Sequence, residues 1–124
     1  MNNIFSGEVK EIVRGSARIA TSAGEFVVGD VSGSERRAGT PATFLISADR
    51  VMIADEGDAC TNRVTGTLRG VDFVGTLVTF LLELENGTEF RIQKQEHQMQ
   101  KIPTKLGEAL IGSWRPEDAY LLAG

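Results

Sequence analysis

The sequence predicts an all-β chain that folds as one barrel-like domain built from two copies of the same unit. The chain has 124 residues, a length typical of one domain. Its 14 glycines are spread along the sequence, as expected where they punctuate short strands. Several short segments either alternate between polar and apolar residues or are rich in β-branched and aromatic residues. A further observation, an internal repeat, indicates two copies.

The predicted strands follow one another at short, even spacing. The clearest are residues 42–46, 51–53, 77–82, 89–93 and 119–122. Residues 89–93 alternate strictly between polar and apolar side chains, which is typical of a half-buried strand. Residues 42–46 and 77–82 are rich in β-branched and aromatic side chains, which fit a pleated surface.

A hairpin over residues 75–93 is the strongest local prediction. Asn86-Gly87 separates its two strands, and this pair favours a type I′ turn because both residues tolerate positive φ. Helical spacing is weak elsewhere; only residues 93–101 could form a turn or two, and Pro103 ends that stretch.

The internal repeat begins with a shared motif. Residues 3–9 and 62–68 both have the pattern Asn-x-x-x-Gly-x-apolar. Later glycines pair in the same order, namely Gly15 with Gly75, Gly24 with Gly87, and Gly39 with Gly107. Each copy then ends in a tripeptide before a short apolar strand, Ser47-Ala48-Asp49 in the first and Arg115-Pro116-Glu117 in the second.

The repeat sets the predicted domain organisation. We expect a single barrel domain over 1–124, with repeat one at 3–54, an acidic linker at 55–61 and repeat two at 62–124. A copy of about 55 residues in short strands has too little core to fold alone. Strands are therefore expected to be exchanged between the copies, which covers sheet edges.

Composition excludes several classes of function. With 13 Lys+Arg against 17 Asp+Glu, the net charge is -4, and no basic stripe for nucleic acid is visible. The single cysteine, Cys60, excludes an internal disulfide and a Cys-based zinc cluster. The single histidine, His97, lies in a polar stretch expected to be an exposed loop, and no catalytic or phosphate-loop motif occurs. We therefore predict no catalytic, cofactor or metal site, no signal peptide and no direct insertion into a membrane.

The second copy carries the motifs of a known family. It begins Asn62-Arg63-Val64-Thr65-Gly66, continues through Val74-Gly75 and Glu85-Asn86-Gly87, and ends Trp114-Arg115-Pro116-Glu117-Asp118. This order resembles a TOBE repeat, the transport-associated OB-fold module. The resemblance covers the whole chain and implies an all-β, OB-fold-like β-barrel built from two tandem TOBE repeats, with exchanged strands. The first copy departs from the pattern, because Ser47-Ala48-Asp49 stands where the family often has Arg-Pro-Glu.

The resemblance implies a function in transport. The chain resembles the C-terminal region of the ATP-binding subunit of ABC importers for polyamines, ferric iron, thiamine and related solutes. It would then be a non-catalytic regulatory and interaction domain, cytoplasmic and peripheral to the inner face of the membrane. Its partners would be the ATPase domain, a second ATP-binding subunit in a homodimer and, indirectly, the permease. ATP and Mg would bind the parent subunit and not this chain, which lacks a phosphate loop.

Two alternatives belong to other classes. Molybdate- and tungstate-binding repeats share the Asn-x-x-x-Gly start, and residues 47–53 resemble their closing segment. Those proteins bind oxyanions between repeats or subunits through backbone N–H groups and hydroxyls. The Ser-Ala-Arg-Asn typical of that group is missing, because Met1-Asn2 precedes Asn3. Binding of single-stranded nucleic acid, which some OB-folds perform, is disfavoured by the acidic charge and the few aromatics.

The candidate residues fall into two groups. Asn3 and Asn62 are predicted to hold the starts of strands through side-chain hydrogen bonds, with a ligand contact as the alternative. The other family-motif positions with a predicted structural role are Gly7, Gly66, Gly75, Gly87, Gly107 and Pro116. Arg115, Glu117 and Trp114 are the candidates for an interface or ligand contact. The alternatives are turn formation for the charged pair and core packing for the tryptophan.

Overall fold

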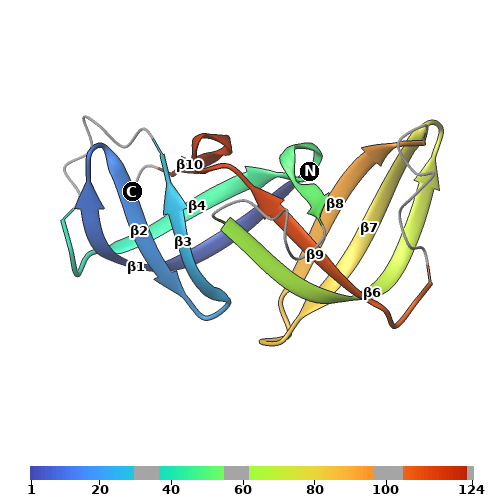
Figure 1. Ribbon diagram of the computed structural model, residues 1–124, viewed down its shortest axis with the longest axis horizontal. Helices are drawn as coiled ribbons and strands as arrows, with labels where there is room; N and C mark the ends of the chain where they lie inside the picture. The colour runs from blue at the N-terminus through green and yellow to red at the C-terminus, as the bar shows by residue number, and fades with distance from the viewer. Residues whose placement is uncertain (30–36, 55–61, 97–104, 123–124) are drawn as a thin grey trace.

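The structure, a computed structural model, describes residues 1–29, 37–54, 62–96 and 105–122. Ten antiparallel strands in these ranges form two five-stranded sheets, each curled into a half-barrel, and the half-barrels lie side by side (Figure 1). The first contains β1 (Asn2–Val13), β2 (Ser16–Thr21), β3 (Gly24–Val28), β4 (Pro41–Ser47) and β10 (Ala119–Leu121). The second contains β5 (Met52–Ala54), β6 (Asn62–Val74), β7 (Leu77–Leu84), β8 (Glu89–Gln95) and β9 (Ala109–Trp114). The all-β prediction is confirmed.

The two halves exchange one strand each. The first sheet has the order β10-β4-β1-β2-β3, and the second has the order β5-β9-β6-β7-β8. Met52 of β5 pairs with Ser113 of β9, and Ala119 of β10 pairs with Ile46 of β4. Each half-barrel is thus completed by a strand from the other copy, as predicted from the need to cover sheet edges.

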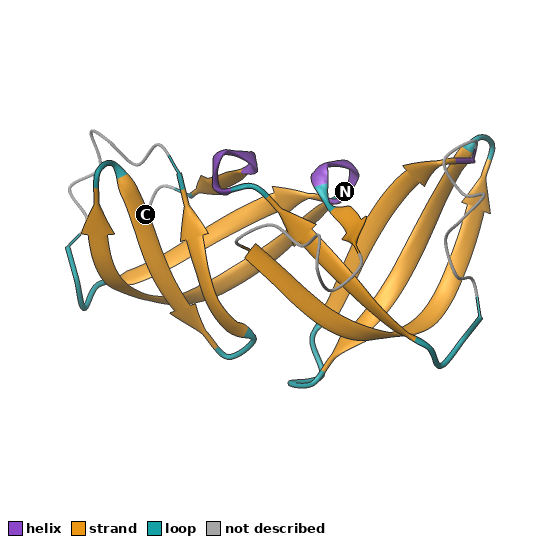
Figure 2. Ribbon diagram, viewed as in Figure 1, coloured by secondary structure: helices purple, strands orange, loops and turns teal. Residues whose placement is uncertain are grey.

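Equivalent irregularities recur in the two copies. The pairing of β1 with β2 shifts between Val9 and Glu11, and that of β6 with β7 shifts between Leu68 and Gly70. Such bulges increase the local bend of a strand, which suits sheets that curl. The short 3₁₀ turns η1 (Ala48–Arg50) and η4 (Pro116–Asp118) follow β4 and β9 and lie on the same side of the molecule (Figure 2).

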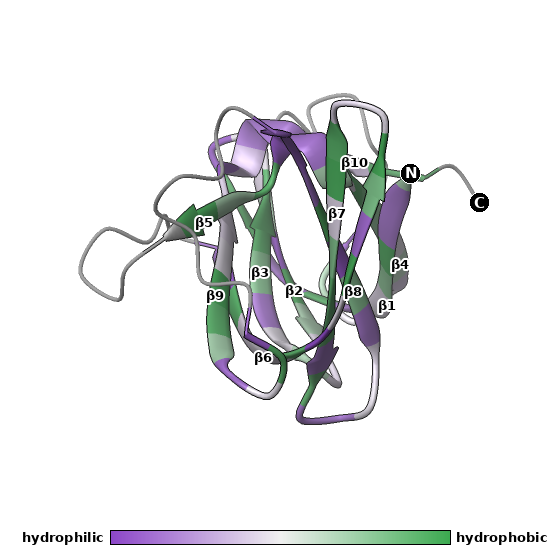
Figure 3. Ribbon diagram, turned by 90° about the vertical axis from the view of Figure 1, so that its right-hand side faces the viewer, coloured by the Kyte–Doolittle hydropathy of each residue, from purple (hydrophilic) through white to green (hydrophobic). Residues whose placement is uncertain are grey.

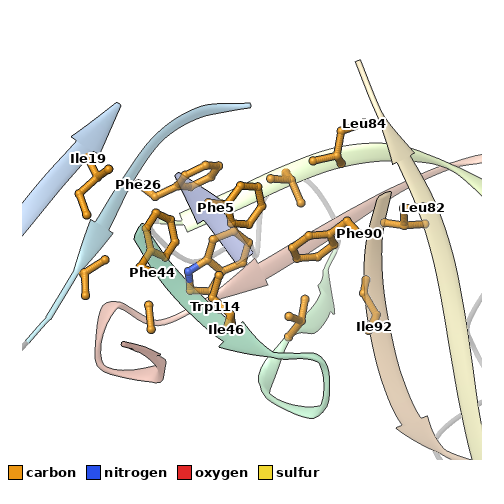
Figure 4. Packing of buried hydrophobic residues seen from close by; sticks show 14 of the residues in the cluster. Phe5, Ile19, Phe26, Phe44, Ile46, Leu82, Leu84, Phe90, Ile92 and Trp114 are labelled. Carbon is orange, nitrogen blue, oxygen red and sulfur yellow. The ribbon is translucent and has the colours of Figure 1, made fainter. Parts of the chain in front are cut away.

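The core is one hydrophobic cluster that both half-barrels share, and it contains a group of packed aromatic rings (Figure 4). The ring of Phe5 lies 5.1 Å from that of Phe26, 5.9 Å from that of Phe90 and 6.2 Å from that of Trp114, measured between centroids. Phe5 and Phe26 belong to the first sheet, whereas Phe90 and Trp114 belong to the second. Because the rings of the two sheets pack on one another, neither half-barrel closes its interior alone.

Alternation of side chains creates this interior. In β7, Val78, Phe80, Leu82 and Leu84 are buried while the residues between them are more exposed, and similar bands of hydrophobic and hydrophilic residues run along the other strands (Figure 3). Side chains that follow one another in a strand point to opposite faces, so this pattern puts one face on the core.

Two local predictions need correction. The β7–β8 turn is not type I′, since Gly87 has positive φ (84°) but Asn86 does not. Gly87 N–H instead donates to Leu84 C=O (2.9 Å), which is the pattern of a type I turn followed by a left-handed glycine. Residues 93–95, where a helical turn was considered, continue strand β8. Residues 97–101 of that stretch, with His97, and the predicted linker 55–61, with Cys60, lie outside the described residues.

In the part of the chain that the structure describes, no helix is long and apolar enough to cross a membrane.

Candidate functional site

The two motif asparagines join the half-barrels. Asn3 Nδ2 donates to Arg91 C=O (2.8 Å), and Asn3 Oδ1 accepts from Arg91 N–H (2.8 Å). Asn62 does the same with Val27, at 2.8 Å to the carbonyl and 2.7 Å from the N–H. Val27 and Arg91 lie on β3 and β8, which are edge strands. Each amide therefore acts as a peptide group that caps the edge of the opposite sheet.

The glycine of each motif allows close packing of neighbouring strands. A Cβ on Gly7 would overlap the carbonyl oxygen of Ala20, and one on Gly66 would come within 2.9 Å of Leu82 Cβ. The other predicted glycines serve turns: Gly75, Gly87 and Gly107 all have positive φ. The motif glycines therefore have structural roles, either where neighbouring strands pack closely or in turns.

The turn after β9 lies against the other half-barrel. The carbonyl of Pro116 accepts a hydrogen bond from Gly29 N–H (2.9 Å), just beyond β3. Asp118 N–H donates to Arg115 C=O (2.9 Å), which closes the turn. The side chains of Arg115 and Glu117 are exposed on it. The structure therefore leaves both charged groups available at the surface.

Trp114 does not lie at the surface. It is fully buried, and its ring stacks 5.6 Å from that of Phe90. Of the two alternatives considered for this residue, the structure places it in core packing, which leaves no surface for a partner. Its indole Nε1 is buried without a hydrogen-bond partner among the described residues.

Two charged groups have a pKa that the fold shifts, Asp49 in the turn after β4 and Lys94 on β8. Ser47 Oγ donates to Asp49 Oδ1 (2.5 Å), and this hydrogen bond lowers the pKa of the Asp49 carboxyl. Burial lowers the pKa of Lys94, with Asp49 opposing that effect to a smaller extent. Lys94 lies opposite the fully buried Val78, so it stands on the core face of β8 at the rim of the second half-barrel.

A polar groove lies on the outside of β6 and β7, where the two half-barrels meet. It has a volume of about 620 Å³ and is centred near Gly66, and we call it the Gly66 groove. Its polar lining includes Ser22, Arg63, Thr65, Thr67, Glu85 and Asn86. Asn86 Nδ2 donates to Ser22 Oγ (2.9 Å), which ties the β7–β8 turn to the β2–β3 turn beside it (Figure 1).

A second groove occupies the equivalent position in the first repeat. It has a volume of about 430 Å³ and is centred near Gly7, and we call it the Gly7 groove. Its polar lining includes Ser6, Glu8, Thr21 and Ser22. Ser6 Oγ lies 2.9 Å from Thr43 Oγ1, within hydrogen-bond distance. Ser22 lines both grooves, so the two sites adjoin at the junction of the half-barrels.

Both grooves are suited to binding a small polar ligand. Hydroxyl and amide groups can donate hydrogen bonds, and the guanidinium of Arg63 adds a permanent positive charge to the larger groove. Among the described residues, no group of three or more His, Cys, Asp or Glu is placed to hold a metal ion. The sequence did not single out Ser22, Arg63 or Thr67, because only the fold brings them together.

Comparison with known families decides which family the chain represents. The TOBE domain matches residues 44–122, from within β4 to just beyond β10. The chain belongs to the TOBE domain family. The matched range extends the resemblance noted in the second repeat into the last strands of the first. A TOBE domain is a non-catalytic module.

The TOBE fold of this chain has a close structural counterpart. The cytoplasmic molybdate-binding protein ModG, in a crystal form with molybdate bound, superposes with a TM-score of 0.85 at 18% sequence identity. The match covers 96% of this chain and 94% of that one. A comparison with curated proteins gives no match. At this identity the likeness establishes the two-repeat fold.

The comparison corrects the function inferred from the sequence. A regulatory domain of an importer's ATP-binding subunit was expected, with an ATPase domain, a second subunit and a permease as partners. The match instead spans nearly all of a protein described as molybdate-binding, and 94% coverage leaves almost none of that chain for an ATPase domain. The resemblance misled because the Asn-x-x-x-Gly start is common to the importer subunits and to the oxyanion-binding repeats.

Proposed function

We propose that this TOBE protein binds a tetrahedral oxyanion of the molybdate or tungstate type in the cytoplasm. The observation that carries the proposal is the agreement in fold with the molybdate-binding protein ModG over nearly the full length of both chains. The two-repeat architecture supports it, since the exchanged strands and the paired asparagines join the half-barrels into a single frame.

The chemistry of the grooves supports the same class of ligand. A compact dianion is held best by several N–H and O–H donors, which spread its charge without bringing in a bulky counter-ion. The described surface offers such donors at Ser22, Thr65 and Thr67. No described cluster of metal-ligating side chains competes with this interpretation.

Ligand-linked stability tests the proposed function. Urea unfolding of the chain is followed with sodium molybdate and with sodium chloride at the same ionic strength. A ligand that binds only the folded state raises the free energy of unfolding by about 2.7 kcal/mol when its free concentration is about 100 times Kd. We expect a rise of this order with molybdate and with tungstate. Unfolding curves that coincide with the chloride control at millimolar oxyanion contradict the proposal.

A further inference from the structure

The ends of two equivalent hairpins expose apolar side chains. The β1–β2 hairpin presents Ile12 and Val13, which are 40% and 53% exposed. The β6–β7 hairpin presents Phe73, Val74 and Leu77, which are 59%, 66% and 38% exposed. Residues at hairpin ends are ordinarily polar, because water surrounds them. Bulky apolar side chains gathered at both ends therefore indicate a contact surface.

Both hairpin ends lie on the same side of the molecule. Figure 1 shows the β1–β2 end and the β6–β7 end at opposite extremes of the long axis, and both reach the upper edge of the view. The 3₁₀ turns η1 and η4 lie between them on that side (Figure 2). A flat partner can therefore touch both hairpin ends at once.

Positive charge accompanies the apolar side chains of the β1–β2 hairpin. Three exposed cations and one exposed carboxylate lie in residues 10–18, namely Lys10, Arg14, Arg18 and Glu11. Glu11 pairs with Arg18 (3.1 Å), and among the described residues Lys10 and Arg14 form no ion pair. Two unpaired cations beside two apolar side chains match a surface that is both anionic and apolar.

Elsewhere on this side carboxylates outnumber cations. The turns η1 and η4, with the residue before each, hold two arginines and three carboxylates, and residues 71–79 of the β6–β7 hairpin hold one charged residue, Asp72. Salt screens interactions beyond about 8 Å, so each hairpin responds to the groups directly beneath it. The β1–β2 hairpin therefore supplies the electrostatic attraction, and the β6–β7 hairpin supplies apolar surface.

Arg14 occupies a turn position that does not favour arginine. It has φ 53°, and together with Gly15 (φ 78°) it forms the two-residue turn of the β1–β2 hairpin. Two residues at positive φ match a type I′ turn, in which asparagine and glycine are preferred. An arginine at positive φ is strained, so its presence at the apex of the hairpin supports a role for its side chain at the surface.

We propose that this side of the molecule binds a lipid bilayer that contains anionic headgroups. The apolar side chains of the two hairpins enter the headgroup region, and Lys10 and Arg14 contact the anionic headgroups. A protein partner fits less well, because five side chains at two separated points provide far less than the about 800 Å² per partner of a stable interface. A shallow contact of this kind is peripheral and needs no spanning segment.

Co-sedimentation of the full chain with lipid vesicles tests the proposal. Vesicles of phosphatidylcholine and phosphatidylserine in equal parts are compared with vesicles of phosphatidylcholine alone. The variants are Arg14→Asn, which removes the charge and suits the positive φ, and Phe73→Ser, which removes an exposed ring. The matched controls are Arg69→Asn and Leu106→Ser. Leu106 is 60% exposed, and Gly107 N–H donates to Leu68 C=O beside Arg69, at the lower edge of Figure 1, away from the hairpin ends.

We expect the wild-type chain to bind the anionic vesicles and to bind phosphatidylcholine vesicles more weakly. Partitioning onto the anionic vesicles should fall about fivefold in Arg14→Asn and about tenfold in Phe73→Ser. Arg69→Asn and Leu106→Ser should partition as the wild type does. No binding of the wild-type chain to the anionic vesicles overturns the proposal in favour of a protein partner, and an equal loss in the variants and their controls overturns the assignment to the hairpin ends.

The result is independent of the proposed oxyanion binding. Ser22 in the β2–β3 turn lines both grooves, and that turn lies at the lower edge of Figure 1, opposite the hairpin ends. A chain that binds vesicles and no molybdate, or molybdate and no vesicles, would therefore overturn one proposal and leave the other standing.

Discussion

Two buried asparagines connect the half-barrels at the scale of single residues. Asn3 and Asn62 are 5% and 1% exposed, and each satisfies both a donor and an acceptor of an edge strand. A carbonyl or N–H left unpaired inside a protein costs about 1–3 kcal/mol. Each asparagine amide therefore stabilises the fold in two ways. It forms two hydrogen bonds, and it keeps a backbone N–H and a carbonyl from being left unpaired.

Replacing the buried Asn62 should destabilise the fold much more than replacing the exposed Asn2. Asn62→Ala orphans Val27 N–H and C=O, and we expect the free energy of unfolding in urea to fall by about 2–4 kcal/mol. Asn2→Ala, an exposed position beside Asn3 on β1, should change it by about 0.5 kcal/mol or less. Equal effects of the two substitutions would show that the bridging amide does not stabilise the fold.

Lys94 makes stability depend on pH in a defined direction. Burial lowers its pKa below the ordinary 10.5, so between the lowered pKa and 10.5 the unfolded chain binds more protons than the folded chain. Its contribution to stability therefore improves as pH rises through that window. We expect Lys94→Met to be more stable than wild type near neutral pH, with a difference that narrows above the ordinary pKa.

Urea unfolding of both chains at neutral and alkaline pH measures that difference. Lys105→Met, at an exposed position, is the control and should show no comparable gain. A constant difference across the range, or a less stable Lys94→Met at neutral pH, contradicts the burial of this charge as the cause.

At the scale of elements, strand exchange makes each copy dependent on the other. Repeat one, which we propose spans 3–54, supplies β5 to the second sheet, and repeat two, proposed as 62–124, returns β10 to the first. Each copy also lacks the asparagine that caps its own outer strand. Isolated half-barrels would expose two unsatisfied edges each.

Splitting the chain tests this dependence. Residues 1–54 and 62–124, produced as separate polypeptides, should each lack cooperative unfolding, and an equimolar mixture should recover it with the circular dichroism of the intact chain. Complementation is expected because the exchanged strands and the asparagine bridges join the two copies through noncovalent contacts. A copy that folds cooperatively alone would show that exchange is not required.

The sequence predicts elements well where the pattern is local and poorly where it depends on the packing of the two copies. Strict alternation in residues 89–93 fixes a strand face, and the repeated glycines mark turns. The partners of Asn3 and Asn62 lie on strands 88 and 35 residues away, which no local pattern reveals. The Asn86-Gly87 pair suits more than one turn, and the observed one keeps Asn86 out of positive φ.

The candidate site was less predictable than the fold for the same reason. Ser22, Arg63 and Asn86 come from three separate elements, and their proximity follows from how the half-barrels meet. A comparison of the repeats could have flagged one signal, the exchange of Glu8 for Thr67 at equivalent positions. The motif residues that dominate the sequence resemblance, by contrast, occupy structural places in the frame.

At the scale of the whole molecule, two copies of one unit form a frame with equivalent polar grooves on its surface. Duplication preserved the backbone, as the matching bulges and asparagine bridges indicate, while the side chains in the grooves diverged. A frame of this kind can bind a ligand at a junction between copies without catalysing a reaction. The proposed role as an oxyanion-binding protein uses that feature.

The most direct measurement of this central claim is calorimetric titration of sodium molybdate into the intact chain, with sodium sulfate and sodium chloride titrated separately. The account predicts saturable heat with molybdate and no saturable heat with chloride. The sulfate titration reports how far the site distinguishes tetrahedral dianions of different size. Absence of saturable heat with millimolar molybdate, from a chain that unfolds cooperatively, would contradict the account.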